Sequence, residues 1–506
     1  MTISHATPTA APLRIAVVGA GFAGLGAARV LREFDHEVVV FEKAPDVGGV
    51  WSSTRRYPGL RTQNDKGTYT FSELPMPRAY PEWPSGEQVQ RYLESYVERF
   101  GLASSLRLST EVSRAVPSED GAGWAVTAGG VTESFDHLVV ANGIFCDPFI
   151  PSFEGVEALE AAGGRILAAS DFHDLRDAVG EHVVVIGYGK SSCDVAVEIS
   201  GVAASTTVVA RELLWKMPRR IKGVLNYKYL LLTRMGEGLF RYLTPVGLEK
   251  FLHGRGDGVR RSLIGGVASV TTGQLRLAAL GLVPGGAFED IARSTVSLVT
   301  EGFFEAVAED RIKVARDLTV SRFLSKDGAP HAELTDGSLV RADLVVCATG
   351  FHQRVPFLDD DVRERLTDER GNFELYRQIL PHDVPNLTFA GYNSSFFSPL
   401  SAEMSAVWIA SLLAGLHTVP PVEERRRLVA ERVAWMEERT RGRHARGTNV
   451  IPFSMHNIDE VLDELGLNVG KAVKARQWLM PVDPGSYRGV ARGLKERYLR
   501  RAAAGR

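Results

Sequence analysis

The sequence of 506 residues contains few cysteines, and its charges nearly cancel. Cys146, Cys193 and Cys347 lie far apart, which excludes a Cys-x-x-Cys redox pair, a zinc cluster and a disulfide reductase. A disulfide framework is not indicated, and this cysteine usage is typical of a reducing cytoplasm. The 59 basic and 61 acidic side chains leave a net charge of −2, which supplies no long-range field for binding nucleic acid.

The sequence also lacks a long apolar run. A membrane-spanning helix needs about 20 apolar residues, whereas the apolar segment SAVWIASLLAGL covers only 405–416. The opening residues MTISHATPTAAP have no apolar segment of the kind that a signal peptide contains. We therefore expect no membrane span, a flexible tail over 1–13 and a cytoplasmic location.

What the sequence does contain is a series of short runs rich in Val and Ile, such as RIAVVG, HVVVIG and DLVVCATG, each ending at glycine. These runs are almost continuously apolar, as are strands that are buried on both faces of a parallel sheet. Helical patterns such as EQVQRYLESYVERF at 87–100 lie between several of them. The alternation predicts an α/β fold with parallel sheets.

Two of these runs lead into a glycine turn and then a helical pattern. The first, RIAVVGAGFAGLGAARVL at 14–31, places Gly19, Gly21 and Gly24 at the spacing of a dinucleotide-binding turn. The second strand of this unit ends at Glu42, and a carboxylate at that position binds free ribose hydroxyls and repels a 2′-phosphate. The first unit is therefore predicted to hold FAD or NAD.

The second unit, VVVIGYGKSSCDVAVEIS at 183–200, has Gly187 and Gly189 but carries Ser192 in place of the third glycine. At the end of its second strand stands Arg211, whose guanidinium group can bind a 2′-phosphate through two hydrogen bonds. This unit is therefore predicted to hold NADPH. A degenerate turn that binds no ligand is the alternative.

Beyond the two turns, the motifs resemble those of the class B flavin-containing monooxygenases along nearly the whole chain. DVGGVW at 46–51 is similar to the segment that this family places along the flavin, and RYPGLRTQNDKGTYTFSELPMP at 56–77 to its active-site stretch. LVVANG at 138–143 and DLVVCATGF at 343–351 resemble the strands through which the chain passes between domains. PNLTFAGYNSSFFSPLSAEMSAVWIASLLAG resembles the last flavin-binding strand and helix.

The resemblance implies two dinucleotide-binding (Rossmann-like) domains, of which the FAD-binding domain is discontinuous in sequence. We expect the FAD-binding domain at 14–165 and 335–506, and the NADPH-binding domain at 166–334. Within the latter, a mostly helical insertion is expected at 222–300, where helical segments are interrupted by glycine.

The resemblance also implies the chemistry. NADPH reduces FAD, and O₂ adds to the reduced flavin to give a C4a-hydroperoxyflavin that oxygenates a small organic substrate. Gln63 and Asn64 are the candidate catalytic residues, because their amides donate hydrogen bonds without a titrating proton. No metal site is expected. The residues expected to contact the cofactors are Gly19, Gly21, Gly24, Glu42, Lys43, Gly49, Val50, Trp51, Val112, Gly187, Tyr188, Gly189, Lys190, Ser191, Ser192, Arg211, Thr349 and Gly350.

Two departures from the family pattern leave the oxygenated atom open. Ala168 stands where the family fingerprint has His, and the nearby His173 is out of register. Gln63 replaces both the Asn of many amine- and sulfide-oxidising members and the Asp of the Baeyer–Villiger branch. The expected activity is N- or S-oxygenation, or hydroxylation, of a small hydrophobic substrate. The alternatives are Baeyer–Villiger oxidation of a ketone, favoured by RYPGLR, an NADPH-linked flavin oxidase or reductase, and a degenerate nucleotide-binding protein.

Structural roles are also expected for three residues between 396 and 401. Ser401 is expected to cap the helix that follows Pro399, and Phe396 and Phe397 are candidates for the substrate wall. The expected partners are a small-molecule substrate and O₂, and a homodimer is the candidate assembly.

Overall fold

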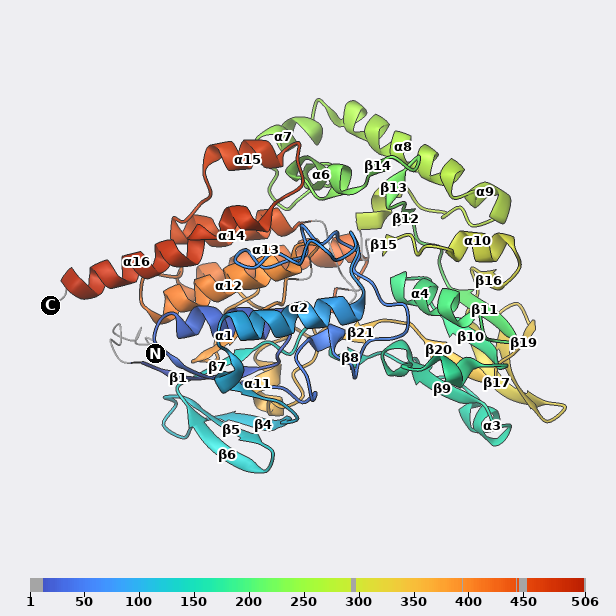
Figure 1. Ribbon diagram of the computed structural model, residues 1–506, viewed down its shortest axis with the longest axis horizontal. Helices are drawn as coiled ribbons and strands as arrows, with labels where there is room; N and C mark the ends of the chain where they lie inside the picture. Colours follow the sequence, from blue (N-terminus) through green and yellow to red (C-terminus); the bar gives the residue numbers. More distant parts are fainter. Residues whose placement is uncertain (1–11, 293–296, 394, 443, 446–452, 505–506) are drawn as a thin grey trace.

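The computed structural model describes residues 12–292, 297–393, 395–442, 444–445 and 453–504. Of the tail expected at 1–13, only Pro12 and Leu13 fall within the described residues. Figure 1 shows two α/β lobes side by side, with a row of helices along the upper edge. No helix in the described part of the chain is long and apolar enough to cross a membrane.

The sheet of the first lobe has five parallel strands in the order β22-β7-β1-β2-β3. Its central strands are β1 (Arg14–Val18), β2 (Glu37–Phe41) and β7 (His137–Val140), and nearly all of their residues are buried. The edge strands are β3 (Leu106–Arg107) and β22 (Leu387–Phe389). Because β22 comes from the last third of the chain, this sheet joins two widely separated segments.

Both faces of this sheet are covered. On one face α1 (Phe22–Arg32) packs against α12 (Ser398–Leu413). On the other lies an antiparallel sheet of β4 (Val112–Pro117), β5 (Trp124–Ala128) and β6 (Val131–Phe135), which shares a hydrophobic cluster with β1 and β7. Coverage of both faces explains why the parallel strands are almost continuously apolar in sequence.

The second lobe repeats the arrangement. Its five parallel strands run in the order β16-β11-β10-β20-β9. They are β9 (Arg165–Ala168), β10 (His182–Ile186), β11 (Ser205–Ala210), β16 (Ile312–Arg316) and β20 (Leu344–Cys347). The elements packed around them are α4 (Lys190–Ile199), α10 (Phe303–Ala308), α3 (Val156–Ala161), β17 (Val320–Lys326), β18 (Ala329–Leu334) and β19 (Leu339–Arg341).

Strands β19 and β20 correct the domain boundary that was expected at 335. Strand β20 lies between β10 and β9, with Val345 opposite Val184, and β19 pairs with β18. Both strands therefore belong to the second lobe, and the chain returns to the first lobe only beyond Gly350. The sequence pattern could not show this, because a glycine-terminated apolar strand looks the same in either sheet.

The stretch 222–300 is mostly helical, and in Figure 1 its helices form the upper right edge of the molecule. Strands β12 and β13 lie just before this stretch; β12 pairs with β15 near its end, β13 pairs with β14 at its start, and α8 is its longest element. The elements are β12 (Lys216–Met217), β13 (Arg220–Ile221), β14 (Leu225–Asn226), α5 (Lys228–Leu231), α6 (Arg234–Gly238), α7 (Leu248–Leu252), α8 (Asp257–Gln274), α9 (Leu277–Leu280) and β15 (Ser297–Leu298).

The chain crosses between the lobes twice, at β8 (Asp147–Pro148) and β21 (Phe351–His352), which pair antiparallel. The two crossings therefore lie side by side between the lobes. The first crossing also corrects the boundary expected at 165, because α3, which follows it, packs on β17 and β18 of the second lobe. The remaining helices are α2 (Gly86–Arg99), α11 (Asp360–Glu364), α13 (Val422–Thr440), α14 (Ser454–Leu465), α15 (Lys471–Gln477) and α16 (Gly489–Ala504).

Candidate active site

The first glycine turn adopts a backbone that requires glycine. Gly19, which follows β1, has a φ of +111°, and a Cβ there would lie 2.4 Å from the Ala141 carbonyl oxygen. A Cβ on Gly24 would lie 1.8 Å from the Gly19 carbonyl oxygen, so α1 packs directly against the turn. Helix α1 begins after Gly21 without a side-chain cap, which leaves its first backbone N–H groups available to a phosphate.

Glu42 follows β2 beside this turn and is buried. Its Oε2 accepts a hydrogen bond from the Ala20 N–H at 2.7 Å, and its Oε1 accepts one from the Ala44 N–H at 2.9 Å. The carboxylate therefore fixes the turn and still has lone pairs for a ribose hydroxyl. The next residue, Lys43, is exposed.

The segment predicted to lie along the flavin folds onto the first turn. Gly49 has a φ of +59°, and a Cβ there would lie 3.3 Å from the Gly21 Cα. Val50 and Trp51 follow in a short 3-10 turn, and both line the cavity between the lobes. Val112, by contrast, begins β4 and is buried between the two sheets of the first lobe, outside that lining.

The second turn has the same geometry with one substitution. Gly187 has a φ of +121°, and a Cβ there would lie 2.6 Å from the Ala348 carbonyl oxygen and 2.9 Å from Ser192 Oγ. Ser192 is fully buried, so it packs the helix against the turn. Helix α4 begins after Gly189 without a side-chain cap, and no atom lies within 4 Å of a Cβ placed on Gly189. This open space at an uncapped helix N-terminus fits a phosphate.

A buried polar cluster lies next to this helix N-terminus. Lys190 donates a hydrogen bond to Asp194 Oδ1, and Thr300 Oγ1 donates to the same oxygen at 2.5 Å. The Tyr57 hydroxyl lies 3.2 Å from both Asp194 Oδ2 and Ser191 Oγ. Burial lowers the pKa of Lys190, although Asp194 opposes this effect. Burial raises the pKa of Tyr57 well above its ordinary value, so its hydroxyl remains a donor. The cluster joins the two lobes.

A cavity of about 660 Å³ lies between the lobes, a size typical of small-molecule sites. The predicted site residues that line it are Val50, Trp51, Gln63, Asn64, Gly187, Tyr188, Gly189, Lys190, Ser191, Arg211, Thr349 and Gly350. The predicted residues that lie outside its lining are Gly19, Gly21, Gly24, Glu42, Lys43, Gly49, Val112 and Ser192.

The two predicted catalytic amides are adjacent in the cavity wall but are held differently. Asn64 is 3% exposed, and its Nδ2 donates to the Phe396 carbonyl oxygen at 2.7 Å. Gln63 Oε1 accepts from the Leu298 N–H at 3.0 Å, and the Gln63 carbonyl accepts from the Tyr227 hydroxyl at 2.7 Å. Within the described residues Gln63 Nε2 donates no hydrogen bond. Gln63 therefore keeps a donor for a ligand, whereas the Asn64 donor holds the wall.

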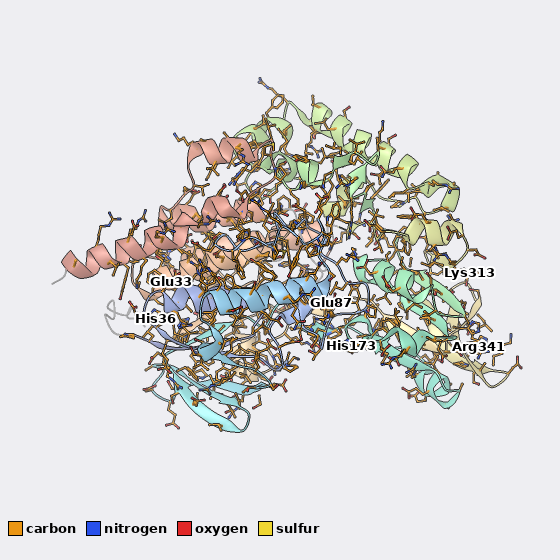
Figure 2. The ribbon with its side chains drawn as sticks, in the orientation of Figure 1. Glu33, His36, Glu87, His173, Lys313 and Arg341 are labelled. Carbon is orange, nitrogen blue, oxygen red and sulfur yellow. The ribbon has the colours of Figure 1, made fainter. Side chains whose placement is uncertain are left out.

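The fingerprint position that lacks His is part of the cavity. Ala168 lines the cavity, and the following Phe172 is fully buried. His173 is exposed, with Nδ1 3.3 Å from the Arg56 carbonyl oxygen, and in Figure 2 its label lies near the junction of the lobes. His173 lies outside the cavity lining. Among the described residues, no group of three or more His, Cys, Asp or Glu side chains could hold a metal ion.

Several cavity residues were not among the predicted site residues, although some of them lie in motifs that resemble those of the family. Phe396 lines the cavity as expected, whereas Phe397 is fully buried outside its lining. Tyr57 and Arg61, for example, belong to the RYPGLR motif at 56–61, but no role was predicted for them. The main additional lining residues are Arg55, Tyr57, Arg61, Leu213, Trp215, Asp290 and Arg441.

The expected cap at Ser401 is wrong. Helix α12 begins three residues earlier, at Ser398, with Pro399 in its first turn and without a side-chain cap. Proline favours the first turn of a helix because its φ is already helical and it needs no N–H partner there. Ser401 instead lies inside the helix, where its Oγ accepts a hydrogen bond from Asn393 Nδ2 at 3.0 Å.

Comparison with known proteins gives matches along most of the chain. The sequence is 26% identical over 499 residues to "Probable flavin-containing monooxygenase 1" of Arabidopsis thaliana. The alignment covers 90% of this chain and 92% of the relative. It is 27% identical over 432 residues to a 4-hydroxybenzoate brominase (decarboxylating) of Marinomonas mediterranea, with 83% and 77% of the two chains covered.

Solved structures have the same fold. Cyclohexanone monooxygenase from Rhodococcus sp. Phi1, bound to NADP⁺, superimposes with a TM-score of 0.66 at 18% identity over 92% of this chain and 98% of that chain. The sequence profile of the family described as Flavin-binding monooxygenase-like matches residues 12–255 and 330–485. The chain therefore belongs to the flavin-binding monooxygenase-like family, as an oxidoreductase that uses FAD and NADPH.

Proposed function

We propose that the first lobe holds FAD, that the second holds NADPH, and that their reactive rings meet in the cavity between the lobes. The observation that carries this assignment is the shared lining: Trp51, from the flavin segment, and the turn 187–191 face one cavity. Each turn also fits a pyrophosphate, since each precedes an uncapped helix, and the space beside Gly189 is open.

The two lobes differ in charge where a dinucleotide fold binds the ribose. Glu42 presents a carboxylate beside the first turn, which suits the free hydroxyls of FAD. Arg211 follows β11 in the second lobe and lines the cavity, where a guanidinium favours the 2′-phosphate of NADPH. Arg211→Gln should therefore raise the KM for NADPH much more than the KM for NADH.

Bound FAD and NADPH supply hydride transfer and oxygen activation, and the residues of the chain position these groups and exclude water. Gln63 offers its Nε2 as a neutral donor that its own Oε1 bond orients. Asn64 holds the wall at Phe396, and Tyr57 keeps the lobes in register. These roles need no nucleophile from the protein.

We propose oxygenation at nitrogen or sulfur of a small hydrophobic substrate. Gln63 and Asn64 place amides in the cavity wall, whereas the next carboxylate, Asp65, is buried outside the lining with Oδ1 3.0 Å from the Gly67 N–H. An amide cannot remove a proton from the oxidant, and the carboxylates that do line the cavity, Glu212 and Asp290, come from the second lobe and the insertion, not from the segment that carries Trp51 and the two amides. When flavin is bound, an oxidant that stayed protonated would be electrophilic at oxygen, so it would react with the lone pair of nitrogen or sulfur and not with a ketone carbonyl.

A rapid-mixing experiment tests this function: the flavin protein is reduced anaerobically with NADPH and then mixed with O₂ while its absorbance is recorded. A long-lived transient flavin spectrum, with conversion of a thioether or tertiary amine to its oxide, is the expected result. Conversion of a cyclic ketone to a lactone would instead establish Baeyer–Villiger oxidation. Direct return to oxidised flavin with stoichiometric H₂O₂ would establish an oxidase, the alternative that Ala168 in the cavity favours.

We also propose a homodimer in the cytoplasm. Exposed apolar side chains on the insertion support self-association, because apolar surface left in contact with water gains free energy when a second copy covers it. They include Val224, Phe251, Val259 and Leu263, which are 51 to 80% exposed. Light scattering of the purified protein measures the assembly directly, and a monomer mass would refute the dimer.

A further inference from the structure

Lys216 is a buried lysine directly behind the second glycine turn. It belongs to β12 and is 2% exposed. Its Nζ donates to the carbonyl oxygen of Tyr188, the middle residue of the turn, at 2.8 Å, and lies 4.5 Å from the centroid of the Tyr188 ring. A weaker contact joins it to Ser297 Oγ at 3.4 Å.

No carboxylate pairs with this ammonium group among the described residues. The nearby Asp194 is occupied by Lys190, Thr300 and Tyr57. Burial of a charge without a counter-ion is unfavourable, so it is retained where it serves a ligand or a fold. The carbonyl and the aromatic face of Tyr188 compensate only part of that cost.

We propose that Lys216 is a positioning residue for the dinucleotide of the second lobe, acting through the turn on the pyrophosphate. This inference rests on the proposed binding of NADPH in that lobe. By holding the Tyr188 carbonyl on the buried side, Lys216 keeps an acceptor oxygen away from the phosphates. Its positive charge adds to that of the α4 N-terminus, which a dinucleotide pyrophosphate approaches.

The position of Lys216 predicts a signature that differs from that of Arg211. The pyrophosphate is common to NADP⁺ and NAD⁺, whereas only NADP⁺ carries the 2′-phosphate. Loss of Lys216 should therefore weaken both ligands by the same factor, and loss of Arg211 should weaken only NADP⁺. The expected factor for Lys216→Met is about tenfold, as for loss of one charge-assisted contact.

The experiment titrates NADP⁺ and NAD⁺ into the flavin-loaded enzyme by calorimetry. The variants are Lys216→Met, Lys216→Gln, Arg211→Gln and a control, Lys313→Met, which removes an exposed lysine from β16 of the second lobe (Figure 2). Lys216→Gln keeps a donor for the Tyr188 carbonyl but lacks the charge, and it serves if the methionine variant does not fold. The melting temperature without ligand is recorded for each.

Equal weakening of NADP⁺ and NAD⁺ by both Lys216 variants, with an unchanged NADP⁺/NAD⁺ preference and no effect of Lys313→Met, supports the proposal. Wild-type affinity in either Lys216 variant, or a loss confined to NADP⁺, overturns it. A lower melting temperature with unchanged affinities would mean that Lys216 is only structural. If the wild-type enzyme binds no NADP⁺, the assignment of NADPH to the second lobe fails first, and this inference with it.

Discussion

The hydroxyl of Tyr57 in the first lobe lies 3.2 Å from Asp194 Oδ2 in the second lobe. Asp194 is 2% exposed and also accepts hydrogen bonds from Lys190 and Thr300. The contact lies beside the turn proposed for NADPH, so this hydrogen bond between the lobes also borders the place where hydride transfer has to be aligned.

Tyr57→Phe removes this link without changing the shape of the side chain. We expect the free energy of unfolding to fall by about 1 kcal/mol, the usual effect of one hydrogen bond. The anaerobic rate of flavin reduction by NADPH should fall as well, because small misalignments of reacting groups slow a reaction strongly. Thr300→Val is the matched control, since it removes a bond to the same carboxylate from within the second lobe. Equal slowing by both variants would contradict a role in aligning the lobes.

Gln63 and Asn64 should respond differently to substitution. Gln63→Glu keeps an oxygen acceptor for the Leu298 N–H but removes the Nε2 donor. We therefore expect the transient flavin species to decay several-fold faster, while the melting temperature stays near that of the wild type. Asn64→Leu leaves the buried Phe396 carbonyl without its donor and should lower the free energy of unfolding by about 1 to 3 kcal/mol. Stopped-flow absorbance and denaturant unfolding measure the two effects. An unchanged lifetime in the doubly substituted protein would remove both residues from the proposed catalytic role.

The two glycines of the second turn offer a test that separates folding from binding. Gly189 has an ordinary negative φ and open space at its Cβ position, whereas Gly187 has a φ of +121° and a backbone oxygen 2.6 Å away. Gly189→Val should therefore fold, retain flavin and lose NADP⁺ affinity by at least about tenfold, because the side chain fills the phosphate space. Gly187→Val should fail to fold or unfold at a lower temperature. Normal NADP⁺ binding by a folded Gly189→Val protein would show that the phosphates lie elsewhere.

Local stereochemistry explains which parts of the site the sequence predicted. Gly19 and Gly187 were recognisable because a positive φ beside a strand requires glycine, and Glu42 and Arg211 because the length of the βαβ unit sets their positions. Gln63, Asn64 and the cavity-lining glycines came from motifs that keep their order along the chain. These features depend on neighbours within a few residues or within one unit.

The remaining features depend on contacts between distant parts of the chain. Tyr57 and Asp194 are 137 positions apart, and Gln63 and Leu298 are 235 apart. No periodicity or local motif specifies such a pair. No role was predicted for Lys216, and only its burial behind Tyr188 indicates one. The error at β20 has the same origin, because its pairing with β10 cannot be deduced from its apolar composition.

A largely buried histidine, whose side chain is 11% exposed, ties the insertion to the C-terminal helices. His456 of α14 has Nδ1 3.1 Å from Glu237 Oε2 and Nε2 2.8 Å from Glu249 Oε1, and it stacks on Tyr242 with ring centroids 4.2 Å apart. Burial acts to lower the pKa of His456, but the hydrogen bonds and charges of the two carboxylates outweigh it and raise the pKa to about 9. The imidazolium therefore holds α6 and α7 against α14 at neutral pH.

The pKa of His456 is higher in the folded protein than in the unfolded chain, where it is about 6.5. The proton bound to His456 therefore stabilises the fold fully below about pH 6.5. This stabilisation is lost as the pH rises through about 9. The shift corresponds to about 3 kcal/mol. His456→Gln cannot titrate, so the difference in unfolding free energy between wild type and variant should shrink by about that amount between about pH 6 and about pH 10. Denaturant unfolding at both pH values measures it, and a pH-independent difference would mean that His456 is not charged in the folded protein. The comparison cancels the titration of groups that do not interact with His456, since both proteins share them, and it leaves the cavity between the lobes untouched.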